Sequence, residues 1–127
     1  MAGERGRRIV LVITDGNDTA ISDIGRDDIR KRAVREDFML YAVAINGHDL
    51  NHQLSDLVPD SGGGYITVKD GDDLNTTLAE IVKELRHQYL LGFRPAVLDG
   101  KIHKLSVQPT RRNLKARAPT AYFAAVK

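Results

Sequence analysis

The chain has 127 residues, of which 42% are hydrophobic and 28% are charged, and its formal net charge is +2 at pH 7. This length predicts one domain with a single core, and no apolar run approaches the roughly 18 residues that a membrane-spanning helix requires. The absence of cysteine excludes disulfides and thiolate sites. The small net charge gives no overall electrostatic case for nucleic acid as the main partner. The N-terminus lacks a signal-peptide pattern, so we expect a cytoplasmic protein, although a full-length relative could be exported.

The first expected strand is Ile9 to Thr14, a run of apolar or β-branched residues without polar interruption. Such a run is typical of a strand that is buried on both faces. An acidic turn, Asp15 to Asp18, follows it directly. Because ligands bind at the carboxyl ends of strands in open α/β sheets, this turn is the first candidate site.

The next segments alternate between helix and strand. We expect helices over 27–36, 48–58 and 73–88, and strands over 38–45 and 65–68. Pro59, Asp60 and the glycines at 62–64 should end the middle helix. Because these glycines follow a helix, they predict a turn and not a phosphate cradle. Strands joined by such helices form parallel crossovers.

From Tyr89 onward the sequence changes to extended segments separated by Pro95, Asp99-Gly100, Pro109 and Pro119. These segments predict two to four antiparallel strands. We therefore expect a single domain, 1–127, with an α/β part at 1–88 and a β-hairpin appendage at 89–127. The predicted fold class is α/β, with about three parallel strands and their helices.

Four segments in this order resemble the second half of a von Willebrand factor type A domain. They are VLVITDGNDT, FMLYAVAI, LSDLVPDSGGGYITV and LAEIVKELRHQYLLGFRP. The similarity is greatest to the bacterial VWFA-related subgroup, in which the last helix leads into a Tyr-Leu-Leu-Gly strand, an Asp-Gly-Lys turn and a basic strand pair. Here these elements are 89–92, 99–101 and 104–117. The resemblance implies a truncated, Rossmann-like sheet.

The resemblance also implies a degenerate metal-ion-dependent adhesion site. In that family a divalent cation, usually magnesium, is held by an Asp-x-Ser-x-Ser motif, a threonine from a middle loop and the Asp of Thr-Asp-Gly. Only the last part is present here, as Thr14, Asp15 and Gly16. Asp15 and Asp18 are thus candidate ligands for weak Mg²⁺ binding, and we expect no resident cofactor. In the alternative interpretation, the two carboxylates cap the loop by accepting hydrogen bonds from backbone amides.

A truncated sheet of this kind would leave Arg8 to Thr14 as an exposed apolar edge. In the intact family fold the corresponding strand is central, and its neighbour on one side belongs to the missing half. Soluble proteins avoid open apolar edges, so we expect Arg8, Val10, Val12 and Thr14 to form an interface in a homodimer. The pairing would use either this edge or exchanged C-terminal strands. Alternatively, the C-terminal strands could fold back over the edge.

A basic run near the C-terminus consists of Arg111, Arg112, Lys115 and Arg117. On a two-stranded ribbon it could contact a phosphate backbone or an acidic protein surface. Solvent-exposed strands often carry Lys and Arg only to prevent edge aggregation, and that interpretation remains open.

Other motifs give little support for metal binding or catalysis. His48 and His52 have the spacing of a helical metal pair, but no third ligand is evident, and two surface histidines are the alternative. No serine lies in a nucleophile elbow. Asp15 could act as a phosphate acceptor or with magnesium in a hydrolase, but no downstream lysine strand accompanies it.

The function predicted from the sequence is therefore that of a non-enzymatic, self-associating protein-interaction module. The protein partner beyond a second copy is not predicted. Two alternatives remain: binding of nucleic acid or an acidic partner through the basic C-terminal strands, and an orphan mobile-gene product with no dedicated function.

Overall fold

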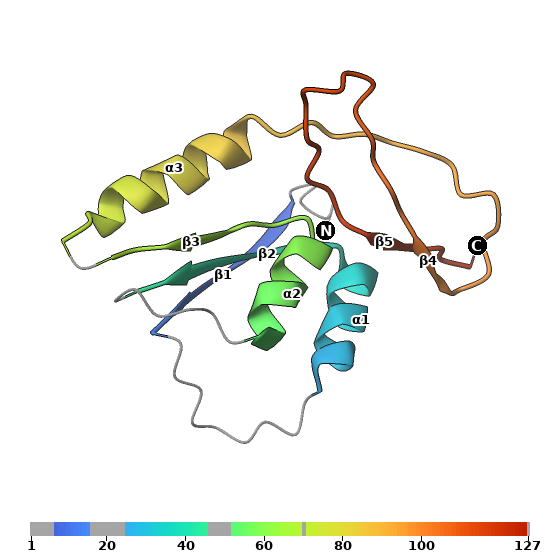
Figure 1. Cartoon of the computed structure of the whole chain (residues 1–127). Helices are drawn as coiled ribbons and strands as arrows, with labels where there is room; N and C mark the ends of the chain where they lie inside the picture. The colour runs from blue at the N-terminus through green and yellow to red at the C-terminus, as the bar shows by residue number, and fades with distance from the viewer. Residues whose placement is uncertain (1–6, 16–24, 46–51, 70, 127) are drawn as a thin grey trace, which may run out of the picture.

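A computed structural model describes residues 7–15, 25–45, 52–69 and 71–126. The fold is mixed α/β, with a three-stranded parallel sheet and a separate two-stranded antiparallel sheet (Figure 1). In chain order the elements are β1 (Arg8–Thr14), α1 (Arg26–Glu36), β2 (Phe38–Ala44), α2 (His52–Asp60), β3 (Tyr65–Thr67), α3 (Leu74–Arg86), β4 (Ile102–Lys104) and β5 (Ala121–Phe123). The predicted class, three parallel strands followed by antiparallel β structure, is confirmed at this level. No helix in the described ranges is long and apolar enough to cross a membrane.

The parallel sheet has the order β1-β2-β3, so β2 is its central strand. Leu11 of β1 is in register with Tyr41 of β2, and Val43 of β2 with Ile66 of β3. Each connection between these strands contains a helix, as parallel pairing requires.

Helices cover β2 from both sides. Figure 1 shows α3 on one face of the sheet and α1 and α2 on the other. On the α3 face, Tyr41 and Val43 pack with Ile81 in one core cluster. On the opposite face, Leu40 and Leu57 belong to a second cluster. The continuous apolar sequence of β2 therefore serves two cores, because successive side chains of a strand point to opposite faces.

The helix α3 begins where the sequence provides a cap. The Asp73 carboxylate accepts hydrogen bonds from the Asn75 backbone N–H and the Thr76 hydroxyl, both at 2.9 Å. Such a cap satisfies an amide that the first helical turn leaves without a partner. These two hydrogen bonds, Thr76 first, hold the pKa of the Asp73 carboxyl below its usual value because they stabilise the charged form.

The predicted group of Pro59, Asp60 and the glycines at 62–64 does end α2, because the last residue of this helix is Asp60. Pro59 itself lies just inside the helix end. The chain turns at Gly62, which has φ of 79°, and the Gly63 N–H donates to the Val58 carbonyl at 3.1 Å. Gly63 itself passes so close to β2 that a Cβ would lie 1.6 Å from the Leu40 carbonyl oxygen. Positive φ and close approach are both conditions that favour glycine.

The C-terminal part forms one short strand pair, β4 with β5, in antiparallel register. It packs against α1, and Thr120 bonds to Asp60 at the end of α2, its N–H donating to the Asp60 carbonyl at 3.0 Å. The alternative in which the C-terminal strands cover β1 is therefore wrong, because their packing partner is a helix. The expected Tyr-Leu-Leu-Gly strand at 89–92 does not pair with another strand and is an extended segment.

The strand β1 is exposed on both faces, contrary to the burial predicted for it. Ile9, Val10, Leu11 and Ile13 have exposed fractions of 39%, 43%, 42% and 49%. The apolar run correctly predicted a strand, but the helices of the described chain pack over β2 instead. As expected, β1 lies at the edge of the parallel sheet.

Candidate interaction surface

The free side of β1 is an open sheet edge. The Thr14 carbonyl accepts from the Ile45 N–H of the chain beyond β2 at 2.9 Å, so Thr14 directs its carbonyl toward β2. Backbone groups alternate in direction along a strand, which leaves the N–H and C=O groups of Ile9, Leu11 and Ile13 directed away from β2. Within the described residues, no strand lies beyond β1 to receive them. The open edge thus offers three consecutive sets of main-chain donors and acceptors.

The side chains on this edge divide between the two faces of the sheet. Because residues in register share a face in a parallel pair, Ile9, Leu11 and Ile13 lie on the α3 face together with Tyr41. Val10 and Val12 lie on the α1–α2 face together with Leu40 and Ala42. Neither described core cluster contains a β1 residue. Both faces of the edge are therefore apolar and accessible.

The four predicted interface residues, Arg8, Val10, Val12 and Thr14, all lie on β1, on its α1–α2 face. Arg8 donates to the Glu36 carbonyl at 3.2 Å, and Val12 and Thr14 are half-buried. The residues between them, Ile9, Leu11 and Ile13, present the open backbone groups and were not predicted. The period-2 alternation of a strand is the signal that could have identified them.

A second apolar surface follows α3. We call residues 89–98, sequence YLLGFRPAVL, the extended segment. Tyr89 and Leu90 are 86% exposed and Leu91 is 70% exposed. Between residues 90 and 98, no backbone group bonds to another described backbone group. Its main packing contact is the edge-on stacking of Phe93 on Tyr122, with ring centroids 4.9 Å apart. The sequence predicted an extended apolar segment here, but not its exposure.

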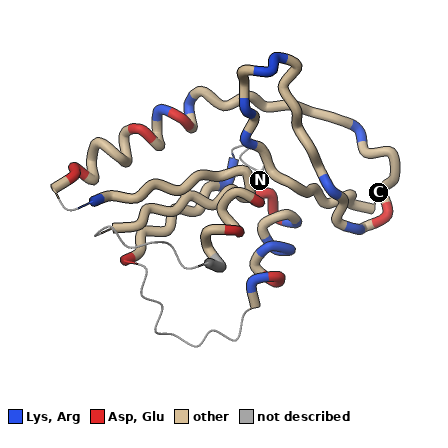
Figure 2. The backbone as a smooth tube through the Cα atoms, viewed as in Figure 1, with Lys and Arg blue, Asp and Glu red and all other residues tan. Residues whose placement is uncertain are grey.

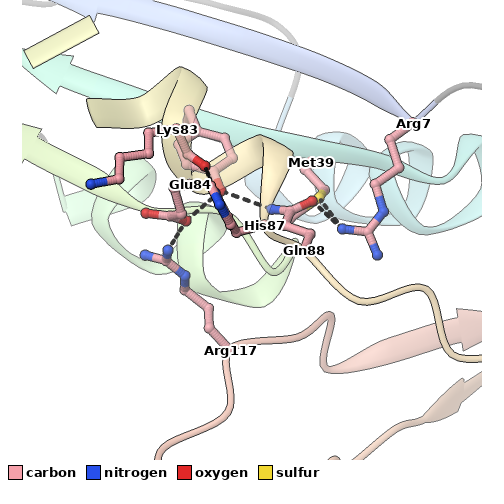
Figure 3. Close-up of polar contacts among 8 residues, drawn as sticks. Arg7, Met39, Lys83, Glu84, His87, Gln88 and Arg117 are labelled. Atoms are coloured by element: carbon pink, nitrogen blue, oxygen red, sulfur yellow. Dashed lines mark hydrogen bonds and ion pairs between the residues drawn. The ribbon is translucent and has the colours of Figure 1, made fainter. Parts of the chain in front are cut away.

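A polar network joins β2 and α3 to Arg7 and to the C-terminal chain (Figure 3). The Tyr41 hydroxyl donates to Glu84 Oε1 at 2.7 Å and accepts from Gln88 Nε2 at 3.2 Å. Arg117 donates to the same Glu84 oxygen, and Arg7 donates to the side chain of Gln88. Tyr41 is 1% exposed, so this network connects a buried strand to the surface. Sequence reasoning did not identify it.

Arg7 also places the extended segment next to the beginning of β1. Its Nη2 donates to the Tyr89 carbonyl at 2.9 Å, and its Nη1 lies 3.7 Å from Met39 Sδ. Arg7 directly precedes β1. The two exposed apolar surfaces therefore meet at Arg7.

The predicted basic patch does not form one unit. Arg111, Arg112 and Lys115 are exposed near a turn closed by the Leu114 N–H and the Arg111 carbonyl at 3.2 Å. Figure 2 shows basic residues along this distal loop of the C-terminal chain. Arg117 instead pairs with Glu84 and lies 6.0 Å from the centroid of the Tyr41 ring. One of the four cations thus holds the C-terminal chain against α3.

Only part of the predicted metal site at the end of β1 lies in the described residues. Asp15 is exposed there, while Asp18 and His48 lie outside the described residues, and of His52 only the backbone is described. No group of three or more His, Cys, Asp or Glu side chains in the described ranges is placed to hold a metal. A magnesium ion usually keeps several waters and takes one or two protein carboxylates, and Asp15 is the predicted carboxylate ligand that the described ranges place at the end of β1.

A cleft of about 350 Å³ separates α1 from the β4–β5 pair. Arg30, Lys31, His103 and Lys104 contribute its basic groups. Two of these four are already engaged: Arg30 pairs with Asp60 at 3.0 Å, and His103 bonds to Asp99 at 2.9 Å. The hydrogen bond from His103 holds the pKa of the Asp99 carboxyl below its usual value. The cleft therefore has little unpaired charge with which to select an anion.

No protein-family model, no curated protein and no solved structure matches this chain. A function for this protein must therefore be inferred from the geometry of its own surface. The most unusual feature of that surface is the apolar edge of β1.

Proposed function

We propose that this protein is a non-enzymatic protein-interaction module that self-associates through β1. The observation that carries this proposal is the open edge of β1, with four large apolar side chains between 39% and 49% exposed. An edge of this kind is a template for pairing with another chain, and stable soluble proteins cover or blunt it. The edge has no proline, no lysine and no bulge between Ile9 and Thr14.

The sequence of β1 is suited to antiparallel pairing with itself. A two-fold axis at Leu11 places Leu11 opposite Leu11 of the second copy and Ile9 opposite Ile13. These are the residues with outward-directed backbone groups, so they would form the hydrogen-bonded pairs of an antiparallel ladder. The same register sets Arg7 against Asp15, which adds charge complementarity at both ends of the ribbon. The product is a six-stranded sheet with both α3 helices on one face.

We further propose that the parallel sheet corresponds to the second half of a von Willebrand factor type A domain. The order β1-β2-β3 and the placement of Asp15 after β1 support this relation. Asp15 would then be the remainder of a degenerate metal-ion-dependent adhesion site. Partner binding through the sheet edge would replace binding through a metal ion.

The test is the molar mass in solution, measured by light scattering over a wide range of concentrations. We expect twice 14.1 kDa for the native chain. Leu11→Lys places a charge at the centre of the ribbon and should give a monomer. Val82→Lys is the matched control, because Val82 is similarly exposed, at 47%, and belongs to α3 and not to β1. A native chain that stays at the mass of one copy at every concentration would refute the proposal.

A further inference from the structure

We infer that the extended segment of one copy packs over the α3 face of the other copy's β1. This inference rests on the proposed self-association through β1 and names the part of the partner that covers the exposed side chains there. The second copy is thus both the ribbon partner and the source of the covering segment. The contact would be reciprocal, because a two-fold axis repeats it on the other side.

A β1–β1 ribbon alone is too small for a stable dimer. It contains seven residues of each copy, whereas a standard interface uses roughly 20–30 residues a side. Strand pairing satisfies backbone groups but does not cover the side chains above the sheet. The side chains of Ile9, Leu11 and Ile13 would still be exposed on the α3 face of the sheet. A second contact between the copies must therefore bury them.

The extended segment is the largest source of apolar surface for such a contact. Of the 16 large hydrophobic residues that are exposed in the described part of the chain, six lie between residues 89 and 98 and four lie on β1. The six are Tyr89, Leu90, Leu91, Phe93, Val97 and Leu98. Apolar surface of this density is typical of a binding surface. The unpaired backbone between 90 and 98 lets the segment adjust to a neighbouring surface.

The position of Arg7 determines which part of the partner the segment can reach. Arg7 bonds to the Tyr89 carbonyl, so the segment starts beside the first residues of β1 on the α3 face. The two-fold register brings the first residues of one β1 against the last residues of the other. Ile13, which at 49% is the most exposed of the large hydrophobic residues on β1, lies at that end and on the same face. Residues 89–91 of one copy are therefore adjacent to Ile13 of the second copy.

Two experiments on the full-length chain test this contact. In the first, the dimer dissociation constant of Leu90→Asp and Leu91→Asp is measured by analytical ultracentrifugation. Both leucines are at least 70% exposed in the single copy, so neither substitution should affect folding of the monomer. We expect each to weaken the dimer about tenfold or more, since it removes apolar burial and introduces a charge. Leu114→Asp, at a leucine 54% exposed on the distal turn, is the control and should change nothing.

The second experiment uses the absence of cysteine in the native chain. A chain carrying Leu91→Cys is mixed with a chain carrying Ile13→Cys, and the disulfide-linked heterodimer is quantified by mass spectrometry. We expect this pair to crosslink faster than Leu114→Cys mixed with Ile13→Cys. Because each chain has one thiol, the heterodimer reports a contact between copies.

The outcomes separate the two proposals. A native dimer that Leu11→Lys dissociates, but that Leu90→Asp and Leu91→Asp leave unchanged, overturns the contact by the extended segment and leaves the β1 ribbon in place. A native chain that is monomeric overturns both. A dimer that the leucine variants weaken but Leu11→Lys does not would overturn the β1 ribbon, and the contact over β1 with it.

Discussion

Leu11 lies in register with Tyr41 on the neighbouring strand, yet Leu11 is 42% exposed and Tyr41 only 1%. The two exposed fractions differ because Tyr41 is on the central strand of the three-stranded sheet and Leu11 is on the edge strand beside it. Tyr41 lies under α3 and is hydrogen-bonded to Glu84, whereas Leu11 belongs to neither core cluster of the described residues. The core therefore ends between two neighbouring strands, and the molecule's behaviour should depend on what covers the outer one.

The first prediction is that thermal stability depends on protein concentration. A second copy that binds the folded chain stabilises it by mass action. Raising the concentration about a hundredfold should raise the unfolding midpoint by about 5 °C or more, measured by differential scanning fluorimetry or circular dichroism. The midpoint of Leu11→Lys should be independent of concentration. A native midpoint that is equally constant would contradict self-association.

The second prediction concerns the buried end of the polar network. Tyr41→Phe removes the hydroxyl that donates to Glu84 and accepts from Gln88. It should lower the free energy of unfolding by about 1 kcal/mol, the typical net value of such a hydrogen bond, measured by urea denaturation. Tyr65→Phe is the control, since Tyr65 is 55% exposed and should behave like the native chain. Equal stability of both variants would show that the network contributes nothing.

The third prediction concerns the ion pair at the surface end of the same network. Arg117 and Glu84 have side chains that are 47% and 39% exposed. A double-mutant cycle with Arg117→Met and Glu84→Gln should give a coupling of about 0.5 kcal/mol, as for exposed pairs in general. Loss of the pair should also speed amide exchange in the C-terminal chain around residue 117, read by mass spectrometry. Unchanged exchange would mean that other contacts alone hold this chain in place.

The fourth prediction concerns the close approach of Gly63 to β2. Gly63→Ala would place a Cβ 1.6 Å from the Leu40 carbonyl oxygen, and both are backbone positions that cannot move independently. We expect a loss of about 3 kcal/mol or more, as for severe overpacking. Gly92→Ala is the control because no atom lies within 4 Å of the added Cβ. Similar unfolding midpoints in urea for the two variants would contradict the packing described at Gly63.

The fifth prediction concerns the acid side of the stability profile. The folded pKa of Asp73 is lowered by its hydrogen bonds to Thr76 and Asn75, so the cap stabilises the fold above the ordinary pKa of aspartate and is lost as the pH falls through the folded value. Asp73→Asn keeps a capping oxygen without a titrating group and should lose less stability on acidification to about pH 3. Asp73→Ala should be less stable than both at neutral pH. Thermal unfolding of the three proteins across this range distinguishes these expectations, and identical acid profiles would contradict them.

The sequence predicted the existence of the main elements better than their burial. Both Ile9–Thr14 and Phe38–Ile45 are continuous apolar runs, and both form strands. A continuous apolar run indicates a strand whose two faces are suited to burial. It does not indicate which helices, if any, pack on those faces. For β2 the helices on both faces belong to the same chain, whereas no β1 residue belongs to either core cluster of the described residues.

Long-range contacts account for the remaining differences. Arg117 lies two residues from Lys115 in the sequence, but its partner Glu84 is 33 residues away, a separation that no local sequence pattern reveals. The glycines after α2 predicted a turn, and the additional need for glycine at Gly63 arises only from the passage of β2. At the acidic turn, Asp15 is described and exposed, whereas Asp18 lies outside the described residues, so its role stays a prediction.

The C-terminal chain has a consequence for the order in which the protein is made. Within seven residues, Arg117 bonds to α3, Thr120 bonds to the end of α2 and Phe123 lies beneath Arg35 of α1, 5.6 Å from its guanidinium carbon to the ring centroid. Translation reaches these residues only after all three helices have been synthesised. A growing chain on the ribosome therefore holds its helices without these contacts until residues 117–123 emerge. The apolar strand β1 is synthesised before the other described elements, so it leaves the exit tunnel before they do. Chaperones that bind nascent apolar strands have their widest opportunity in that interval.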